Sequence, residues 1–183
     1  RGAGENRDEV VLDFRESDDP DGISVDSDGF TIENLTVKNV VRNGIIVNGA
    51  ERVTFRNLWV GWDDDDVLEN NGAYAVYPVG CDQVLVEDTE VVAAADAGIY
   101  VGQSTKIIVR NNVVHDSVAG IEIENSDDAD VYGNETYDNT AGVLVFVLPN
   151  LDKKDGNRTK VHDNDIHDNN HPNFGVEGTI VSN

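Results

Sequence analysis

A pattern of 22 residues recurs three times between Ala97 and Phe146. The copies begin AGIYVGQS, AGIEIENS and AGVLVFV, and the glycines that mark them are Gly98, Gly120 and Gly142. A fixed period of this length indicates a repeat architecture. Within each copy apolar residues alternate with other residues, as Ile99 and Val101 do, and an asparagine-rich corner follows. This alternation predicts short strands joined by turns, unlike the spacing of an amphipathic helix.

The repeat predicts an all-β chain that forms a single right-handed parallel β-helix of about seven coils, each of roughly 22 residues. We expect residues 1–183 to form one such domain. Alignment on the corner glycine places the strand starts at Gly22, Gly44, Ala75, Gly98, Gly120 and Gly142. A second column of inward residues is predicted at Ile32, Phe55, Val86, Val109, Val131 and Val161.

Two polar columns accompany the predicted strands. The corner after the second strand carries Asn34, Asn57, Asp88, Asn111 and Asp163, followed by Asn112, Asn134 and Asn164. Stacked asparagines can bond to each other along the axis and tolerate a tight corner. The next column reads Glu33, Arg56, Glu87 and Arg110, which predicts a ladder of opposite charges. We interpret both columns as structural.

The charge balance is strongly acidic, with 13 Lys and Arg against 36 Asp and Glu and a formal net charge of −23. Such a surface repels nucleic acid and anionic lipid, so neither is expected as a partner. No apolar run is long enough to insert into a membrane. The acidity indicates either a surface adapted to high salt, as in halophilic proteins, or a set of cation sites. Cys81 is the single cysteine, so no internal disulfide can form, and we expect it to be a small buried residue.

The first and last segments read as partial coils without polar caps, which would leave strand edges unpaired. We therefore expect the chain to be a segment of a longer protein, or its coil ends to meet a partner domain or a second copy. A further function class is thus a structural protein that assembles by end-to-end stacking of coils.

Several phrases, ENNGAYAVYPVGCDQVLVED, DAGIYVGQS, VAGIEIENS, TAGVLVF and NNHPNFG, resemble exported proteins with tandem right-handed parallel β-helix repeats. This resemblance covers most of the chain and implies an extracellular, cell-surface or periplasmic location. It brings no established reaction. More loosely, the chain is similar to carbohydrate-binding and sugar-hydrolase β-helices, whose Asp-Pro-His catalytic phrase is missing here.

The outward positions of the glycine-led strands form the candidate ligand-binding surface. They include Tyr77, Tyr100, Glu122, Glu124 and Phe146. Aromatic rings offer faces for a sugar, and carboxylates accept its hydroxyl groups. Two interruptions of the repeat, at residues 61–71 and 149–158, flank this surface and could wall a groove. The alternative is that the loops cover the aromatic residues, which then form a side core.

A run of acidic residues in the first interruption is the candidate metal site. It consists of Asp63, Asp64, Asp65, Asp66 and Glu69. These residues supply enough oxygen ligands for calcium, the one cofactor that the sequence suggests. The run lacks the alternating ligands of an EF-hand loop, so a solvated turn is the alternative.

Catalytic candidates occupy repeated positions. His115 and Tyr137 are equivalent in successive coils and could act as base and acid. Glu122 and Glu124 lie about 7 Å apart on one face of a strand, a spacing that inverting glycosidases use. Residues placed by a repeat usually stack instead. We therefore favour a carbohydrate-associated binding or scaffold module without chemistry of its own, with a polysaccharide lyase, epimerase or glycosidase as the alternative.

Overall fold

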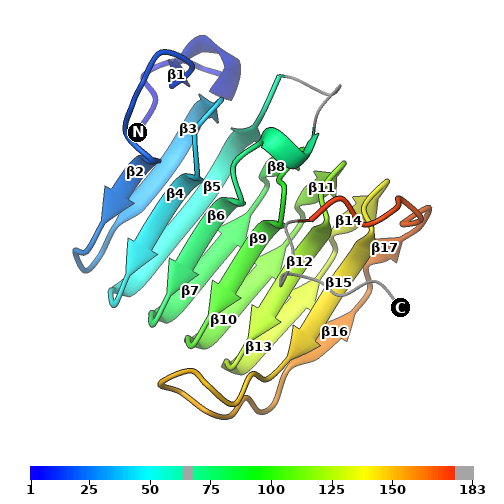
Figure 1. Ribbon diagram of the computed structural model, residues 1–183. Coiled ribbons are helices and arrows are strands. Elements are labelled where there is room, and N and C mark those ends of the chain that lie inside the picture. The colour runs from blue at the N-terminus through cyan, green and yellow to red at the C-terminus, as the bar shows by residue number, and fades with distance from the viewer. Residues whose placement is uncertain (64–67, 176–183) are drawn as a thin grey trace.

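The computed structural model describes residues 1–63 and 68–175 of the 183-residue chain, which form a parallel β-solenoid (Figure 1). One face is a six-stranded sheet in the order β15-β12-β9-β6-β4-β2. Its strands are β2 (Asp21–Val25), β4 (Asn43–Asn48), β6 (Tyr74–Val79), β9 (Ala97–Gly102), β12 (Ala119–Glu124) and β15 (Ala141–Phe146). All neighbouring pairs in this sheet are parallel.

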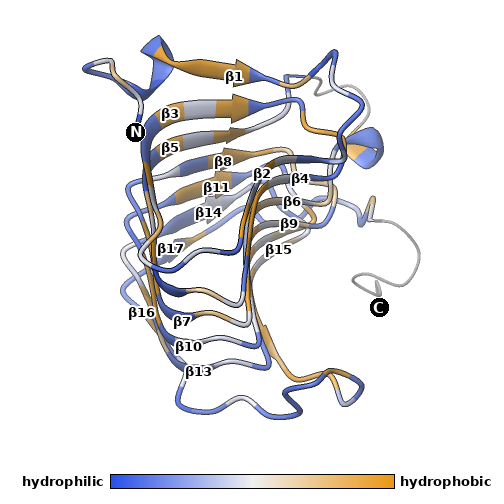
Figure 2. Ribbon diagram, turned by 90° about the vertical axis from the view of Figure 1, so that its left-hand side faces the viewer, coloured by the Kyte–Doolittle hydropathy of each residue, from blue (hydrophilic) through white to orange (hydrophobic). Residues whose placement is uncertain are grey.

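The other two faces belong to one eleven-stranded sheet that bends at a corner. The second face contains β7 (Asp82–Glu87), β10 (Thr105–Arg110), β13 (Asp127–Tyr132) and β16 (Lys160–His162). The third face contains β1 (Val11–Asp13), β8 (Glu90–Val92), β11 (Val113–His115), β14 (Glu135–Tyr137) and β17 (Asp165–Ile166). Two long strands, β3 (Thr31–Lys38) and β5 (Glu51–Gly61), run through the corner and join both faces. Figure 2 shows the three faces around one interior.

The predicted fold is confirmed, including nearly all of its register. The six strands of the first sheet correspond to about six turns, close to the seven expected. Backbone pairing aligns Ile32 with Phe55 and continues through the whole predicted second column to Val161. Only short 3-10 helices, η1 (Arg7–Glu9) and η2 (Leu68–Asn70), accompany the strands of the described residues.

The interior is filled by these apolar columns, except at Val161, which was predicted to point inward but is 42% exposed in the last coil. Phe55, Ile45, Ile99 and Ile121 are fully buried, and Cys81 is buried beside them as expected. Each fully buried aliphatic side chain stabilises the fold by roughly 1.5–3 kcal/mol relative to exposure. A third inward column, not singled out from the sequence, runs through Val37, Val60, Val91 and Val114 on the third face.

The corners are held by the predicted asparagine column. The Nδ2 of Asn112 donates to Oδ1 of Asn134 at 2.9 Å, and Asn134 repeats this bond to Asn164 at 2.9 Å. Asn111 and Asn57 adopt positive φ angles of 54° and 47°, a conformation that asparagine tolerates better than most residues. The column is therefore structural, as predicted.

The charge ladder is also present. Glu87 accepts hydrogen bonds from Arg56 at 2.5 Å and from Arg110 at 2.5 Å. Arg56 also lies 3.5 Å from Glu33. Both arginines hold the pKa of Glu87 below its usual value, against the desolvation that burial imposes. The ladder accounts for Arg110 without a catalytic role.

Candidate functional site

The outer side of the six-stranded sheet carries three tyrosines and three acids close together. We call Tyr74, Tyr77, Tyr100, Asp96, Glu122 and Glu124 the tyrosine–carboxylate cluster. Alternation of side chains along β6, β9 and β12 turns Tyr77, Tyr100, Glu122 and Glu124 away from the aliphatic interior. Tyr74 joins them from the start of β6, and Asp96 joins them from just before β9. Backbone pairing places Glu122 opposite Tyr100 and Glu124 opposite Gly102. Residues from successive repeats thus meet on one surface.

The tyrosine rings pack on each other. The ring centroids of Tyr74 and Tyr77 are 4.4 Å apart in a stacked arrangement, and those of Tyr77 and Tyr100 are 5.0 Å apart, edge to face. The Tyr100 ring also lies over Gly102, where an added Cβ would stand 2.4 Å from Cε1 of the ring. Only glycine leaves room for the Tyr100 ring in this position.

The carboxyl groups of the cluster are buried, and within residues 1–63 and 68–175 no lysine or arginine forms an ion pair with them. Glu122 is 4% exposed, and no hydrogen bond to its side chain joins it to the described residues. Burial is the main reason that the pKa of Glu122 is raised to about 8, and the charges of Asp96 and Glu124 add to this effect. Burial also raises the pKa of Asp96, although Tyr74 opposes this shift with a hydrogen bond. The Tyr100 hydroxyl donates to Oε2 of Glu124 at 2.6 Å.

The predicted ligand-binding residues are therefore brought together, but in a more enclosed setting than a flat exposed strip. Tyr100 is 6% exposed and Glu124 is 5% exposed. Tyr77 and Phe146 are half-buried and remain accessible, and Leu144 packs against the cluster beside them. The burial of Tyr100 agrees with the alternative in which the aromatic residues form a side core. A ligand-binding role for these residues stays a prediction.

Replacing Tyr100 by alanine is expected to lower the free energy of unfolding by roughly 3–5 kcal/mol, because a buried aromatic ring leaves a cavity. The loss can be measured by urea denaturation. The half-buried Tyr77 is the matched control, and its replacement by alanine is expected to cost less. A loss below about 1 kcal/mol for Tyr100→Ala would show that the ring is not part of a packed side core.

The predicted calcium residues are only partly within the described chain. Asp64, Asp65 and Asp66 lie outside the described residues, and Glu69 lies in η2. Asp63 accepts hydrogen bonds at its Oδ2 from Arg15 at 2.7 Å and from Lys38 at 2.8 Å. These groups lower the pKa of Asp63, with Lys38 as the largest cause. The charge of Asp63 is thus balanced by protein cations, and calcium binding stays a prediction.

The catalytic candidates of the third face stack on one another. The rings of His115 and Tyr137 are parallel with centroids 4.7 Å apart, and those of Tyr137 and His167 are 5.5 Å apart. Nδ1 of His115 lies 2.6 Å from Oδ2 of Asp116. Such a ladder stabilises neighbouring coils, which is the structural alternative for these residues.

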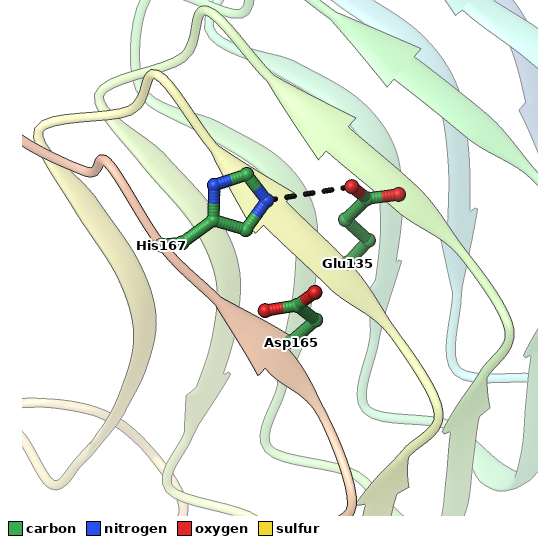
Figure 3. Close-up of side chains that lie close together, drawn as sticks. All are labelled: Glu135, Asp165 and His167. Carbon is green, nitrogen blue, oxygen red and sulfur yellow. Dashed lines mark hydrogen bonds and ion pairs between the residues drawn. The ribbon is translucent and has the colours of Figure 1, made fainter.

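A second group of side chains that sequence reasoning missed lies at the end of this ladder. Glu135, Asp165 and His167 each offer one ligand atom, and these atoms all lie within 4.8 Å of one another (Figure 3). Nδ1 of His167 is 3.0 Å from Asp168, and its Nε2 is 3.4 Å from Glu135. These two carboxylates, Asp168 first, raise the pKa of His167.

Two members of the tyrosine–carboxylate cluster were also missed. Tyr74 begins β6, and Asp96 stands just before β9. A sequence signal existed for Asp96, which is a single acid after the small residues Ala93, Ala94 and Ala95. Tyr74 precedes the aligned strand start, so the repeat alignment gave no reason to single it out.

Comparison with known proteins adds a family and a fold relative. The family model described as "Periplasmic copper-binding protein (NosD)" matches residues 4–182. A solved structure of the enzymatically active domain of tailspike protein 2 from bacteriophage CBA120 is similar with a TM-score of 0.55 and 15% identity. That alignment covers 80% of this chain but 25% of the tailspike chain, so the chain spans about a quarter of that protein's length.

This structural likeness supports the parallel β-helix fold alone. A search of the curated proteins finds no significant match. Among the described residues, no helix is long and apolar enough to cross a membrane.

Proposed function

The chain belongs to the NosD family of periplasmic copper-binding proteins, and we propose that it is a binding module that holds a neutral glycan on the outer face of its six-stranded sheet. Its family places it outside the cytoplasm, as the sequence predicted. The net charge of −23 disfavours anionic sugars such as uronates, so a neutral glycan is the better match.

The burial of Glu122 carries this proposal. Removing a carboxyl group from water without a partner costs several kcal/mol in principle, and proteins keep such groups mainly at functional sites. Here Glu122 lies among the tyrosines, with no lysine or arginine of the described residues paired to it. A sugar hydroxyl could bond to this group while a sugar ring covers the accessible face of Tyr77.

The family description names copper, so the donor atoms of this chain have to suit one of its ions. Cu(I) prefers thiolate and thioether ligands. The sequence contains no methionine, and its one cysteine, Cys81, is buried with its Sγ directed at the carbonyl oxygens of Val47 and Val79. The donor set therefore does not fit Cu(I). Without an available thiolate or thioether, imidazole and carboxylate groups are the metal ligands that this chain can offer.

A glycan array provides the test of the proposal. We expect the purified protein to bind one or more neutral oligosaccharides, and Tyr77→Ala to bind them at least about tenfold more weakly because the accessible ring is lost. Stability of the variant is measured in parallel, so that unfolding is distinguished from a lost contact. Absence of binding to every neutral glycan by the folded parent protein would contradict the proposal.

Hydrolysis of a sugar bond is a second candidate, favoured by one observation. Because the pKa of Glu122 is raised to about 8, this residue keeps its proton at neutral pH, and Glu124 lies two residues along the same strand. An inverting glycosidase uses a protonated acid to protonate the leaving oxygen and a second carboxylate to activate water. Hydrolysis is established if the parent protein releases new reducing ends from the bound glycan and Glu122→Gln does not. If neither protein releases reducing ends, hydrolysis is contradicted and binding remains as the activity.

A further inference from the structure

The third face carries histidines at two levels of the solenoid with similar surroundings. His115 ends β11, His167 follows β17, and the ring of Tyr137 is stacked between them. In both cases the aspartate that follows the histidine holds Nδ1, at 2.6 Å for Asp116 and at 3.0 Å for Asp168. Nε2 of each histidine therefore faces away from this aspartate.

The remaining nitrogen points in both cases to a glutamate of the preceding coil. Nε2 of His115 lies 3.7 Å from Oε1 of Glu90, and Nε2 of His167 lies 3.4 Å from Oε1 of Glu135. The two levels thus share a histidine, an orienting aspartate and a facing glutamate.

The levels differ in two ways that concern charge. Two residues before His115 stands Val113, whereas two residues before His167 stands Asp165, which is paired with Glu135 across the strands. Glu90 also forms an ion pair with Arg7. Within residues 1–63 and 68–175, no lysine or arginine forms an ion pair with Glu135 or Asp165. The His167 level thus has one more carboxylate, and no lysine or arginine of the described residues is paired with it.

We infer that Glu135, Asp165 and His167 bind a divalent first-row transition-metal ion, and that the His115 level does not. The three ligand atoms lie within 4.8 Å of one another and converge from β14, β17 and the residue after β17 (Figure 3). Imidazole nitrogen and carboxylate oxygen suit Cu²⁺ and Zn²⁺, with Cu²⁺ the tighter of the two.

The surroundings support metal binding through His167. A carboxylate on the far nitrogen of a ligating histidine fixes its tautomer and ring orientation, and Asp168 occupies that position. Stacking on Tyr137 further restrains the ring. The Glu135 side chain is 46% exposed and Asp165 is exposed, so an ion can reach both carboxylates without unfolding of the chain.

The two levels supply matched variants for the test. His167→Tyr keeps a ring in the stack, as Tyr137 does one coil earlier, but removes the nitrogen ligand. Asp165→Val recreates the residue found at the His115 level, and His115→Tyr is the control. Zn²⁺ binding is measured by isothermal titration calorimetry in about 150 mM NaCl, a physiological ionic strength that screens the acidic surface. Cu²⁺ is examined by pulsed EPR for coupling to an imidazole nitrogen.

The expected result is one tight Zn²⁺ equivalent and one coupled imidazole for the parent protein. Asp165→Val is expected to weaken Zn²⁺ binding at least about tenfold, and His167→Tyr to abolish the imidazole coupling, while His115→Tyr changes neither. The inference is overturned if His115→Tyr has the larger effect, if His167→Tyr leaves the coupling intact, or if Ca²⁺ competes with Zn²⁺ at equal concentration. Circular dichroism confirms that each variant is folded.

Discussion

Replacing Glu122 by glutamine is expected to make the protein more stable at pH 8 than the parent, with little difference at pH 5. The carboxyl group of Glu122 has a pKa of about 8 in the folded protein against a model value of 4.5. Between these values the folded state holds a proton that the unfolded state has released, so the parent loses stability as the pH rises. The slope is about 1.4 kcal/mol per pH unit at most, which gives a difference on the order of a few kcal/mol at pH 8.

Urea denaturation of both proteins at pH 5, 6, 7 and 8, a range of about three units that spans most of the shift, provides the measurement. Glu51→Gln is the matched control, because it removes the same charge from a side chain that is 57% exposed. Subtraction of the control removes the general effect of the net charge. A constant difference between Glu122→Gln and the parent across this range would mean that Glu122 is already ionised in the folded protein.

Loss of the Asn134 side chain is expected to destabilise the fold by roughly 3–5 kcal/mol, because several buried groups lose partners together. Asn134 is 1% exposed. Its Oδ1 accepts from the backbone nitrogen and Nδ2 of Asn112, at 3.0 and 2.9 Å. Its Nδ2 donates to the carbonyl oxygen of Val109 at 3.0 Å and to Asn164 at 2.9 Å. Asn134→Ala removes all four bonds.

The free energy of unfolding of Asn134→Ala is compared with that of Asn150→Ala, an exposed asparagine in the second interruption. We expect Asn150→Ala to lie within about 0.5 kcal/mol of the parent. If the two variants were equally stable, the asparagine column would contribute nothing beyond its backbone conformation.

The fold could be predicted from the sequence because the repeat itself encodes the register. Alignment on Gly98, Gly120 and Gly142 places equivalent side chains on successive coils, and parallel pairing then follows. The strands of the third face were harder to predict from the sequence, because β11 and β14 are short. In addition, β3 and β5 pass through the corner without a break. In these two coils the corner, at Asn34 and Asn57, bends one continuous strand and does not separate two strands.

The site could be predicted only in part, since alternation along a strand tells which way a side chain points but not what covers it. Tyr77, Tyr100, Glu122 and Glu124 were expected together on one surface, where the structure places them. The burial of Tyr100 and Glu122 depends on packing between coils and could not be read from the period. Grouping of Glu135 with Asp165 depends on pairing across the interruption at residues 149–158, which hides the repeat.

The most direct test of glycan binding on the six-stranded sheet is a titration by isothermal calorimetry with the oligosaccharide that binds most strongly on the array. Tyr77→Ala is compared with Tyr132→Ala, a partly exposed tyrosine on the second face that stacks on His162. We predict that Tyr77→Ala binds at least about tenfold more weakly than the parent, since a stacked ring is lost, and that Tyr132→Ala binds as the parent does. Unchanged affinity in Tyr77→Ala, or a loss confined to Tyr132→Ala, would contradict a glycan site on this sheet.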